Sequence, residues 1–378
     1  MGIGLAGCHF WDNFTTYFNT YYNMDRLMFE TEDEFEYLEE KKRVTPRLLV
    51  PEPDVFFAEE SSTGAPPFMQ EFVISQQKLQ PVKIKLDSIL IKGSKILAHS
   101  PKSDYVEGSL FLMAKAYFYR SEWLPSQIKC SELIDKFPAG DFSPDAHLLM
   151  AKNYLIQRKF HAGKILLSRT VDIAWIKDRY DILSEAFRLE ADLALYLGEE
   201  EKALIPYRQA IVQTDDGLMK AKWQVELASL LFRMGKFEKA AVEFAKVQKF
   251  DPDYQAEFEG YLYQASSLLR IGQFEKADEI LEDLEGDGNN EEWLDYIYAQ
   301  RMNEIRLKDN KEDLEKAEDY ADSVYINKPP ITVTYFEIGM DYFKEFDYME
   351  ARKYFARAKN VRSPIFRTAG KLYELLNA

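Results

Sequence analysis

A helical hairpin pattern that recurs along most of the chain restricts its possible folds more than any other feature. In residues 228–252, two apolar-periodic segments meet at a glycine, with Phe232 on the first apolar stripe and Phe237 on the second. Gly235 between them suits the left-handed backbone at which a helix stops and reverses. The stretch therefore predicts an antiparallel helical hairpin, with Ala240 small because the two helices cross closely there.

The same three positions recur along the sequence. The small residue returns at intervals of 34 to 40 residues, at Ser126, Gly163, Ala203, Ala240, Ala277, Ala317 and Ala351. The large residue four positions later is Cys130, Leu167, Tyr207, Phe244, Leu281, the weak member Ala321, and Phe355. The reversal glycine returns as Gly198, Gly235 and Gly272. Self-similarity at this period predicts a solenoid of helix pairs, each packed on its neighbours.

These residues resemble the tetratricopeptide repeat (TPR) family, which has small residues at positions eight and twenty of its unit. Position eight is filled by Ala228, Ala265 and Gly339. The resemblance is strong over 203–285 and 335–360, and weakest at 287–330. It implies an all-α, right-handed superhelical TPR solenoid of about seven to eight antiparallel helical hairpins. The long linkers between hairpins look like those of bacterial envelope TPR proteins.

Composition divides the rest of the chain into segments. We predict a truncated signal or lipobox region at 1–12, an N-terminal helical segment at 13–43, a Pro-rich extended loop at 44–67, and the TPR array at 68–378. The helical segment is either a partner-docking helix or part of a capping repeat, and we favour the capping repeat. It forms one helix or two helices broken near 31–33.

The Pro-rich loop is too apolar for a free linker, so we predict that part of it lies along the solenoid. We expect the first element of the array, at 68–100, to be a divergent hairpin that Pro81 interrupts. Seven further hairpins or near-hairpins follow. We expect the short helix at 366–378 to be a cap, with the first helix of a further repeat as the alternative.

Net charge and cysteine usage exclude several classes of function. The chain carries a net charge of −16, so nucleic-acid binding and adhesion to anionic membranes are disfavoured. Of the two cysteines, Cys130 occupies a core position of its hairpin and Cys8 lies far away in sequence, so a structural disulfide is not expected.

The N-terminal stretch Leu5-Ala6-Gly7-Cys8 resembles the bacterial lipobox, which predicts lipidation at Cys8. Only seven residues precede this cysteine and none is basic. Either Met1 lies inside the apolar region of a longer signal peptide, or the match is accidental. His9 stands where an aspartate would retain such a protein in the inner membrane, so the resemblance favours the outer membrane.

No catalytic or metal-binding motif accompanies the repeats. The four histidines have no metal spacing, and nucleophile, phosphate-loop and zinc-protease motifs are absent from the sequence. Gly2, Gly4 and Gly7 match a dinucleotide fingerprint, but no strand or βαβ pattern surrounds them. We therefore expect no enzyme activity, no catalytic residues, no metal and no cofactor.

A TPR array curls so that its first helices line a concave groove. Groove positions implied by the family fall on Lys115, Phe118, Tyr119, Lys152, Arg188, Asp192, Tyr196, Arg233, Arg270, Phe343 and Lys344. Arginine and tyrosine are common interface anchors, so this lining predicts a protein-binding groove. The carboxylate clamp of chaperone-tail binders is missing, because Phe111 and Lys115 replace its lysine and asparagine.

The sequence thus predicts a non-catalytic protein–protein interaction scaffold. Its leading form is a lipid-anchored TPR protein on the periplasmic face of the outer membrane, broadly resembling assembly-factor lipoproteins of the BamD type. It would assist outer-membrane protein assembly or secretion, with a β-barrel assembly or secretion component as partner. The alternatives are a cytosolic TPR adaptor with an accidental lipobox and, ranked lower, a nutrient (glycan) capture lipoprotein.

Overall fold

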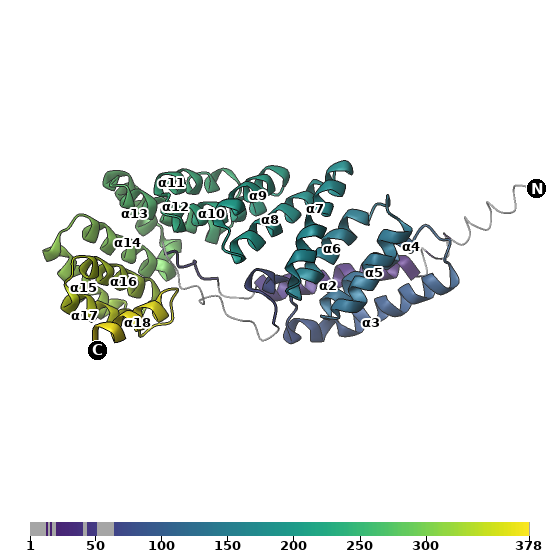
Figure 1. Ribbon diagram of the computed structural model, residues 1–378, viewed down its shortest axis with the longest axis horizontal. Coiled ribbons are helices and arrows are strands. Elements are labelled where there is room, and N and C mark those ends of the chain that lie inside the picture. The colour runs from purple at the N-terminus through teal and green to yellow at the C-terminus, as the bar shows by residue number, and fades with distance from the viewer. Residues whose placement is uncertain (1–12, 14–15, 17–19, 41–43, 51–63, 378) are drawn as a thin grey trace, which may run out of the picture. The chain divides into compact units, whose positions relative to one another are not determined.

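Every regular element in the described part of the computed structural model is a helix, which confirms the all-α prediction. The structure describes residues 13, 16, 20–40, 44–50 and 64–377. The chain forms two compact units, each with its own set of packed helices (Figure 1). Unit 1 comprises Met1–Arg43 and Glu60–Gln213, and unit 2 comprises Val44–Glu59 and Thr214–Ala378.

The helices of each unit follow one another in chain order. Unit 1 contains α2 (Tyr22–Glu40), η2 (Pro67–Phe72), α3 (Gln76–His99), α4 (Val106–Tyr119), α5 (Trp123–Lys136), α6 (Ser143–Ile156), α7 (Phe160–Ile176), α8 (Tyr180–Tyr196) and α9 (Glu200–Gln213). Unit 2 contains α10 (Gly217–Arg233), α11 (Phe237–Phe244), η3 (Val247–Lys249), α12 (Tyr254–Arg270), α13 (Phe274–Gly286), η4 (Gly288–Trp293), α14 (Leu294–Leu307), α15 (Lys311–Val324), α16 (Pro329–Lys344), α17 (Tyr348–Ala358) and α18 (Phe366–Asn377).

Successive helices pair as antiparallel hairpins, and the recurring small residues lie where each pair crosses. Within the described residues, the seven hairpins expected after Ser100 are α4–α5, α6–α7, α8–α9, α10–α11, α12–α13, α14–α15 and α16–α17. Gly163 shows how close the crossing is, because a Cβ there would lie 2.5 Å from Leu155 Cδ2. Ala240 and Phe244 are fully buried, as the repeat pattern predicts. The TPR-like hairpin repeat is therefore confirmed.

The predicted hairpin at 68–100 is wrong. The short 3-10 helix η2 is followed by one continuous helix, α3, which runs through Pro81 without a break. Pro81 is only the sixth residue of α3, so it costs one backbone hydrogen bond near the helix start rather than dividing the helix. The buried residues Leu86 and Ile89 fix the face that α3 packs inward.

The helix that packs against α3 is α2, although a long segment that includes Thr45–Val50 separates the two helices in sequence. The break near 31–33 that one of the two alternatives for the N-terminal segment required is wrong, because α2 continues through these residues. The Thr31 hydroxyl donates to the carbonyl of Leu27 at 2.7 Å, which satisfies this buried side chain inside the helix. Met24 and Met28 are buried in the core of unit 1, so this face of α2 serves packing.

The reversal between α16 and α17 offers a test of the hairpin geometry. Phe346 lies there at φ 64°, close to the φ of 70° at Gly235 in the equivalent turn. Both turns close with the same two bonds: the reversal residue donates its N–H three residues back, and the next residue donates five residues back. A non-glycine residue at positive φ is strained by about 1–2 kcal/mol.

We expect Phe346→Gly to raise the free energy of unfolding by about 0.5–1 kcal/mol, because glycine adopts the positive φ without strain. The gain is smaller than the strain itself, since glycine also has greater conformational freedom in the unfolded chain. The Phe346 side chain is 76% exposed, so little packing is lost. Urea denaturation followed by circular dichroism measures the change. Gly235→Ala is the control and should cost about 1 kcal/mol, because only backbone strain acts where a Cβ meets nothing within 4 Å. A loss of stability in Phe346→Gly would contradict the strain at this turn.

Candidate functional site

The predicted groove residues of unit 1 lie on α4, α6 and α8, and three of them, Lys152, Arg188 and Tyr196, contact the chain's own segment 64–74. Arg158 donates through Nε to the carbonyl of Gly64 at 2.8 Å and through a terminal nitrogen to the Tyr196 hydroxyl at 2.9 Å. The Tyr196 ring also packs on Phe68, with ring centroids 5.5 Å apart. The first-helix face of unit 1 is therefore partly covered by the end of the Pro-rich loop and by the residues that follow it.

Phe72 is the centre of these contacts. The Lys152 ammonium lies 4.3 Å from the Phe72 ring centroid, and the Arg188 guanidinium lies 5.4 Å from it. Lys152 also pairs with Glu185 at 2.6 Å, and Arg188 pairs with Glu71 and with Asp192. Burial acts to lower the pKa of the Arg188 guanidinium, but the neighbouring carboxylates outweigh it and hold that pKa above its ordinary value.

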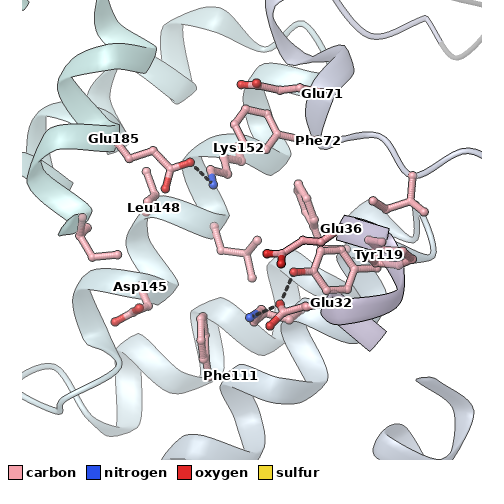
Figure 2. A pocket seen from close by; sticks show the side chains of 16 residues that line it. Glu32, Glu36, Glu71, Phe72, Phe111, Tyr119, Asp145, Leu148, Lys152 and Glu185 are labelled. Carbon is pink, nitrogen blue, oxygen red and sulfur yellow. Dashed lines mark hydrogen bonds and ion pairs between the residues drawn. The ribbon is translucent and has the colours of Figure 1, made fainter. Parts of the chain in front are cut away.

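A pocket of about 480 Å³ opens beside Phe72, between α2, α4, α6 and α8 (Figure 2). Figure 2 shows Glu32 accepting a hydrogen bond from the Tyr119 hydroxyl at this pocket. Glu32 also pairs with the Lys115 ammonium. Burial, reinforced by Glu32, raises the pKa of Tyr119. Phe118, predicted as an exposed groove residue, is only 3% exposed, because its ring packs edge-on against Trp123 inside the hairpin.

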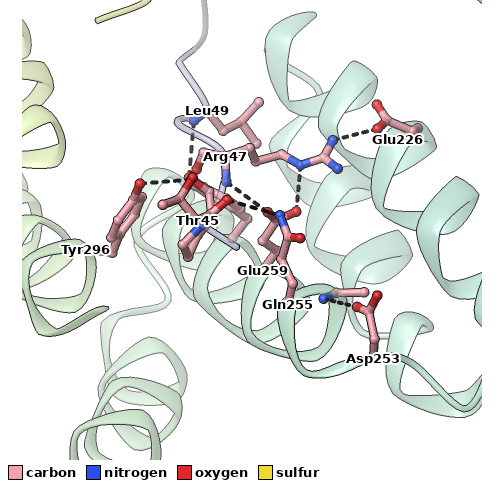
Figure 3. A network of polar contacts seen from close by, with 11 residues as sticks. Thr45, Arg47, Leu49, Glu226, Asp253, Gln255, Glu259 and Tyr296 are labelled. Carbon is pink, nitrogen blue, oxygen red and sulfur yellow. Dashed lines mark hydrogen bonds and ion pairs between the residues drawn. The ribbon is translucent and has the colours of Figure 1, made fainter. Parts of the chain in front are cut away.

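Unit 2 presents a more defined site on its first-helix face, where α10, α12 and α14 hold the segment Thr45–Val50 (Figure 3). Arg47 is the anchor. Its Nε donates to Glu259 at 2.6 Å, and a terminal nitrogen donates to Glu226 at 2.9 Å. Burial acts to lower the pKa of the Arg47 guanidinium, yet the two glutamates outweigh it, so this arginine stays charged.

Side chains of the repeats also bind the backbone of this segment. Tyr296 donates to the carbonyl of Pro46 at 2.8 Å, and Gln255 donates to the carbonyl of Thr45 at 3.1 Å. The Tyr263 hydroxyl donates to the carbonyl of Arg47 and accepts from the N–H of Leu49 at 3.1 Å. Glu259 also accepts the N–H of Arg47 at 2.8 Å. These are contacts that any extended peptide could make, because they use main-chain atoms.

Burial raises the pKa of two tyrosines of this site. Burial, followed by the charges of Asp295 and Glu259, raises the pKa of Tyr296 to about 12. Burial and Glu259 likewise raise the pKa of Tyr263. Both hydroxyls therefore stay protonated near neutral pH and remain hydrogen-bond donors to the segment.

The segment ends in an apolar contact. Val50 is 3% exposed and packs with Val333 of α16 and with Ile365 and Ala369. Beyond it lies a pocket of about 430 Å³, whose lining includes the predicted groove residues Arg270 and Lys344. The Arg270 side chain already has partners within unit 2, since it pairs with Glu337 at 2.5 Å and stacks on Phe232. The two remaining predicted residues, Arg233 and Phe343, lie at the C-terminal ends of α10 and α16.

The sequence prediction missed the residues that hold Arg47. The family resemblance places exposed groove residues at positions 2, 5, 9, 12 and 13 of the repeat. Glu259 occupies position two, counted from Ala265 at position eight, so this rule would have included it. Glu226 and Tyr263 occupy position six of successive repeats, which that rule leaves out. A further signal was available in Arg47 itself, an arginine inside an apolar segment of an acidic chain.

The residues that the structure describes offer no evident centre for other chemistry. They contain no group of three or more histidine, cysteine or acidic residues placed to hold a metal ion. Burial raises the pKa of the Cys130 thiol to about 12, which makes it a poor nucleophile at neutral pH. None of these helices is both long enough and apolar enough to cross a membrane. The predicted lipidation residue, Cys8, lies outside the described residues.

Both units are TPR-like arrays of helical hairpins. No protein-family model matches the chain, and no curated protein matches it. Among solved structures, a tetratricopeptide repeat protein from Parabacteroides merdae is similar at 15% identity over 72% of this chain and 99% of its own, with a TM-score of 0.49. The apo form of the quorum sensor NprR from B. thuringiensis is similar at 11% identity over 93% and 97%, with a TM-score of 0.46. At these identities and scores, neither likeness carries an argument about what this chain binds.

Proposed function

We propose that the chain is a non-catalytic scaffold that binds extended segments of other proteins on its first-helix faces. The observation that supports this proposal most directly is the seat of Thr45–Val50 on unit 2. There, five main-chain groups of one extended segment are hydrogen-bonded by side chains of α12 and α14. A face that recognises main-chain atoms in this way has the chemistry required to bind a peptide.

The proposed location is the periplasmic face of the outer membrane, with a lipid anchor on Cys8. The lipobox-like Leu5-Ala6-Gly7-Cys8 supports it, as does the resemblance of the long repeat linkers to those of envelope TPR proteins. An anchored scaffold would recruit its partners beside a membrane, which suits assistance in outer-membrane protein assembly or secretion. The alternative is a cytosolic adaptor that uses the same faces.

A mild-detergent pull-down of the full chain from native membranes tests both parts of this proposal. Mass spectrometry should identify protein partners and an acylated Cys8 as the mature N-terminus. A co-purifying β-barrel protein would support a role in outer-membrane assembly. An unmodified N-terminus in the soluble fraction, with cytosolic partners, would leave the scaffold in place and reject the anchor. Recovery of the chain without any partner would count against the scaffold itself.

A further inference from the structure

The site around Arg47 has a chemistry more specific than general peptide binding. Glu259 contributes a carboxylate whose side chain is only 1% exposed, and its charge is met by the Arg47 guanidinium. Glu226, on the neighbouring helix α10, meets a different nitrogen of the same guanidinium. Two carboxylates on two helices thus bind two nitrogens of one planar group. Lysine, a single point charge, cannot reproduce this fork.

The face of unit 2 also constrains which residues fit on either side of Arg47. Pro46 is buried, and Figure 3 shows Tyr296 bonded to the segment beside Arg47, where it donates to the Pro46 carbonyl. Three residues after the arginine, Val50 fills the apolar contact with α16 and α18. Leu48 and Leu49 between them are half-buried. The face therefore fits an extended segment with proline, then arginine, then an aliphatic residue three positions further on.

The segment lies outside the repeats that hold it. Thr45–Val50 belongs to no helix, and it is 212 residues away in sequence from Glu259. The hairpins α10–α11, α12–α13 and α14–α15 form their own crossings without it. If the segment left, the face would present two carboxylates and two tyrosine hydroxyls, a surface complementary to a cationic peptide.

We propose that this face of unit 2 is an arginine-directed binding site for extended Pro-Arg-containing segments of a partner protein, and that Thr45–Val50 is its exchangeable internal occupant. The inference rests on the proposed scaffold function and names the class of partner segment. Because the occupant is covalently attached, it competes at a high effective concentration. The apparent affinity of a partner segment is then its intrinsic affinity multiplied by the fraction of faces that the internal segment leaves free.

A peptide-binding experiment on the full chain tests this inference. The probe is a fluorescently labelled peptide with the sequence of residues 44–50, and its anisotropy is measured against wild-type chain and against Arg47→Ala. Weakening the internal occupant should tighten binding of the peptide about tenfold or more. Replacing the peptide's arginine with lysine or alanine should weaken binding about tenfold, as expected when a charged hydrogen bond is lost.

Two further variants keep the test decisive. Arg47→Ala leaves a buried glutamate without its cation, so circular dichroism must first show native helix content. If Arg47→Ala does not fold, Arg47→Lys replaces it, since it retains a cation while losing the fork. Adding Glu259→Gln to the chosen host should abolish the preference for arginine. Equal affinity for wild-type and the Arg47 variant, or no preference for the arginine peptide, would overturn the inference.

The oligomeric state decides between a partner protein and a second copy of the chain. Light scattering of the wild-type chain should show no dimer that forms with rising concentration and dissociates when the peptide is added. Such a dimer would assign the face to self-association and overturn the partner assignment. If the chain captures partner proteins but the Arg47 variant ignores the peptide, the scaffold stands and this inference falls. If the peptide binds as expected but the chain captures no partner, the arginine-directed site stands and its use in a scaffold is rejected.

Discussion

Glu337→Ala is expected to lower the free energy of unfolding of unit 2 by about 3–5 kcal/mol, because it leaves the largely buried Arg270 guanidinium without its carboxylate, whereas Arg306 keeps Asp341. Glu337 on α16 binds Arg270 of α12 at 2.5 Å and Arg306 of α14 at 2.9 Å. The exposed fractions of these side chains are 11%, 12% and 9%. One carboxylate therefore holds two guanidinium groups that would otherwise repel each other.

Urea denaturation of the full chain measures this loss, and hydrogen exchange of the amides in α12, α14 and α16 locates it. Glu337→Gln keeps the shape and one acceptor oxygen, so it should cost less than the alanine variant. Glu279→Ala, on the exposed face of α13, is the matched control and should change stability by no more than about 0.5 kcal/mol. Equal effects of Glu337→Ala and Glu279→Ala would show that the ion pairs of Glu337 with Arg270 and Arg306 do not stabilise unit 2.

The contribution of Glu337 should also depend on pH. Burial acts to raise the pKa of this carboxyl, but Arg270 and Arg306 outweigh it and hold the pKa below its ordinary value of 4.5. A depressed folded-state pKa stabilises the protein above the unfolded pKa, and this stabilisation is lost as the pH falls through the folded value. The stability gap between wild type and Glu337→Gln should thus be full at pH 7 and shrink below pH 4.5. A gap that stays constant to acid pH would contradict the assignment.

Phe244→Ala is expected to cost about 3–5 kcal/mol, because it removes a large side chain from the crossing of a hairpin. Phe244 is fully buried at the end of α11, and its ring lies 5.9 Å from that of Tyr263 on α12. The cavity left behind cannot close readily, since both neighbouring helices are held by their own hairpins. The change should lower the urea midpoint and speed hydrogen exchange in α10, α11 and α12.

Val242→Ala provides the control on the same helix. Val242 is 58% exposed, so its truncation should leave stability within about 0.5 kcal/mol of the wild type. Phe244 also lies behind Tyr263, which binds the backbone of the segment around Arg47. Phe244→Ala should therefore weaken the seat of that segment as well, which faster exchange of the Leu49 amide would report. Similar stabilities of the two variants would refute the role of Phe244 as a hairpin core residue.

The hairpins themselves were predictable from the sequence, because their signals are local. Apolar residues three or four apart specify which face of each helix is buried, and a small residue opposite a large one specifies where two helices cross. Positions such as Ala240 and Phe244 are accordingly buried where the repeat places them. Pro81 misled the prediction because the tertiary packing of α3 on α2 outweighs the loss of one hydrogen bond.

Only the tertiary structure decided which charged groups meet. The repeat pattern marks Arg188 and Arg270 as groove residues, yet the structure commits them to Glu71 and Glu337, which lie 117 and 67 residues away in sequence. Likewise, nothing local joins Arg47 to Glu259. Periodicity reports which side of its own helix a residue occupies, whereas such pairs depend on how successive hairpins rotate against one another and where an extended segment settles on them. The sequence by itself therefore determined the repeat and its core, and the tertiary structure decided which of the chain's own residues its faces contact.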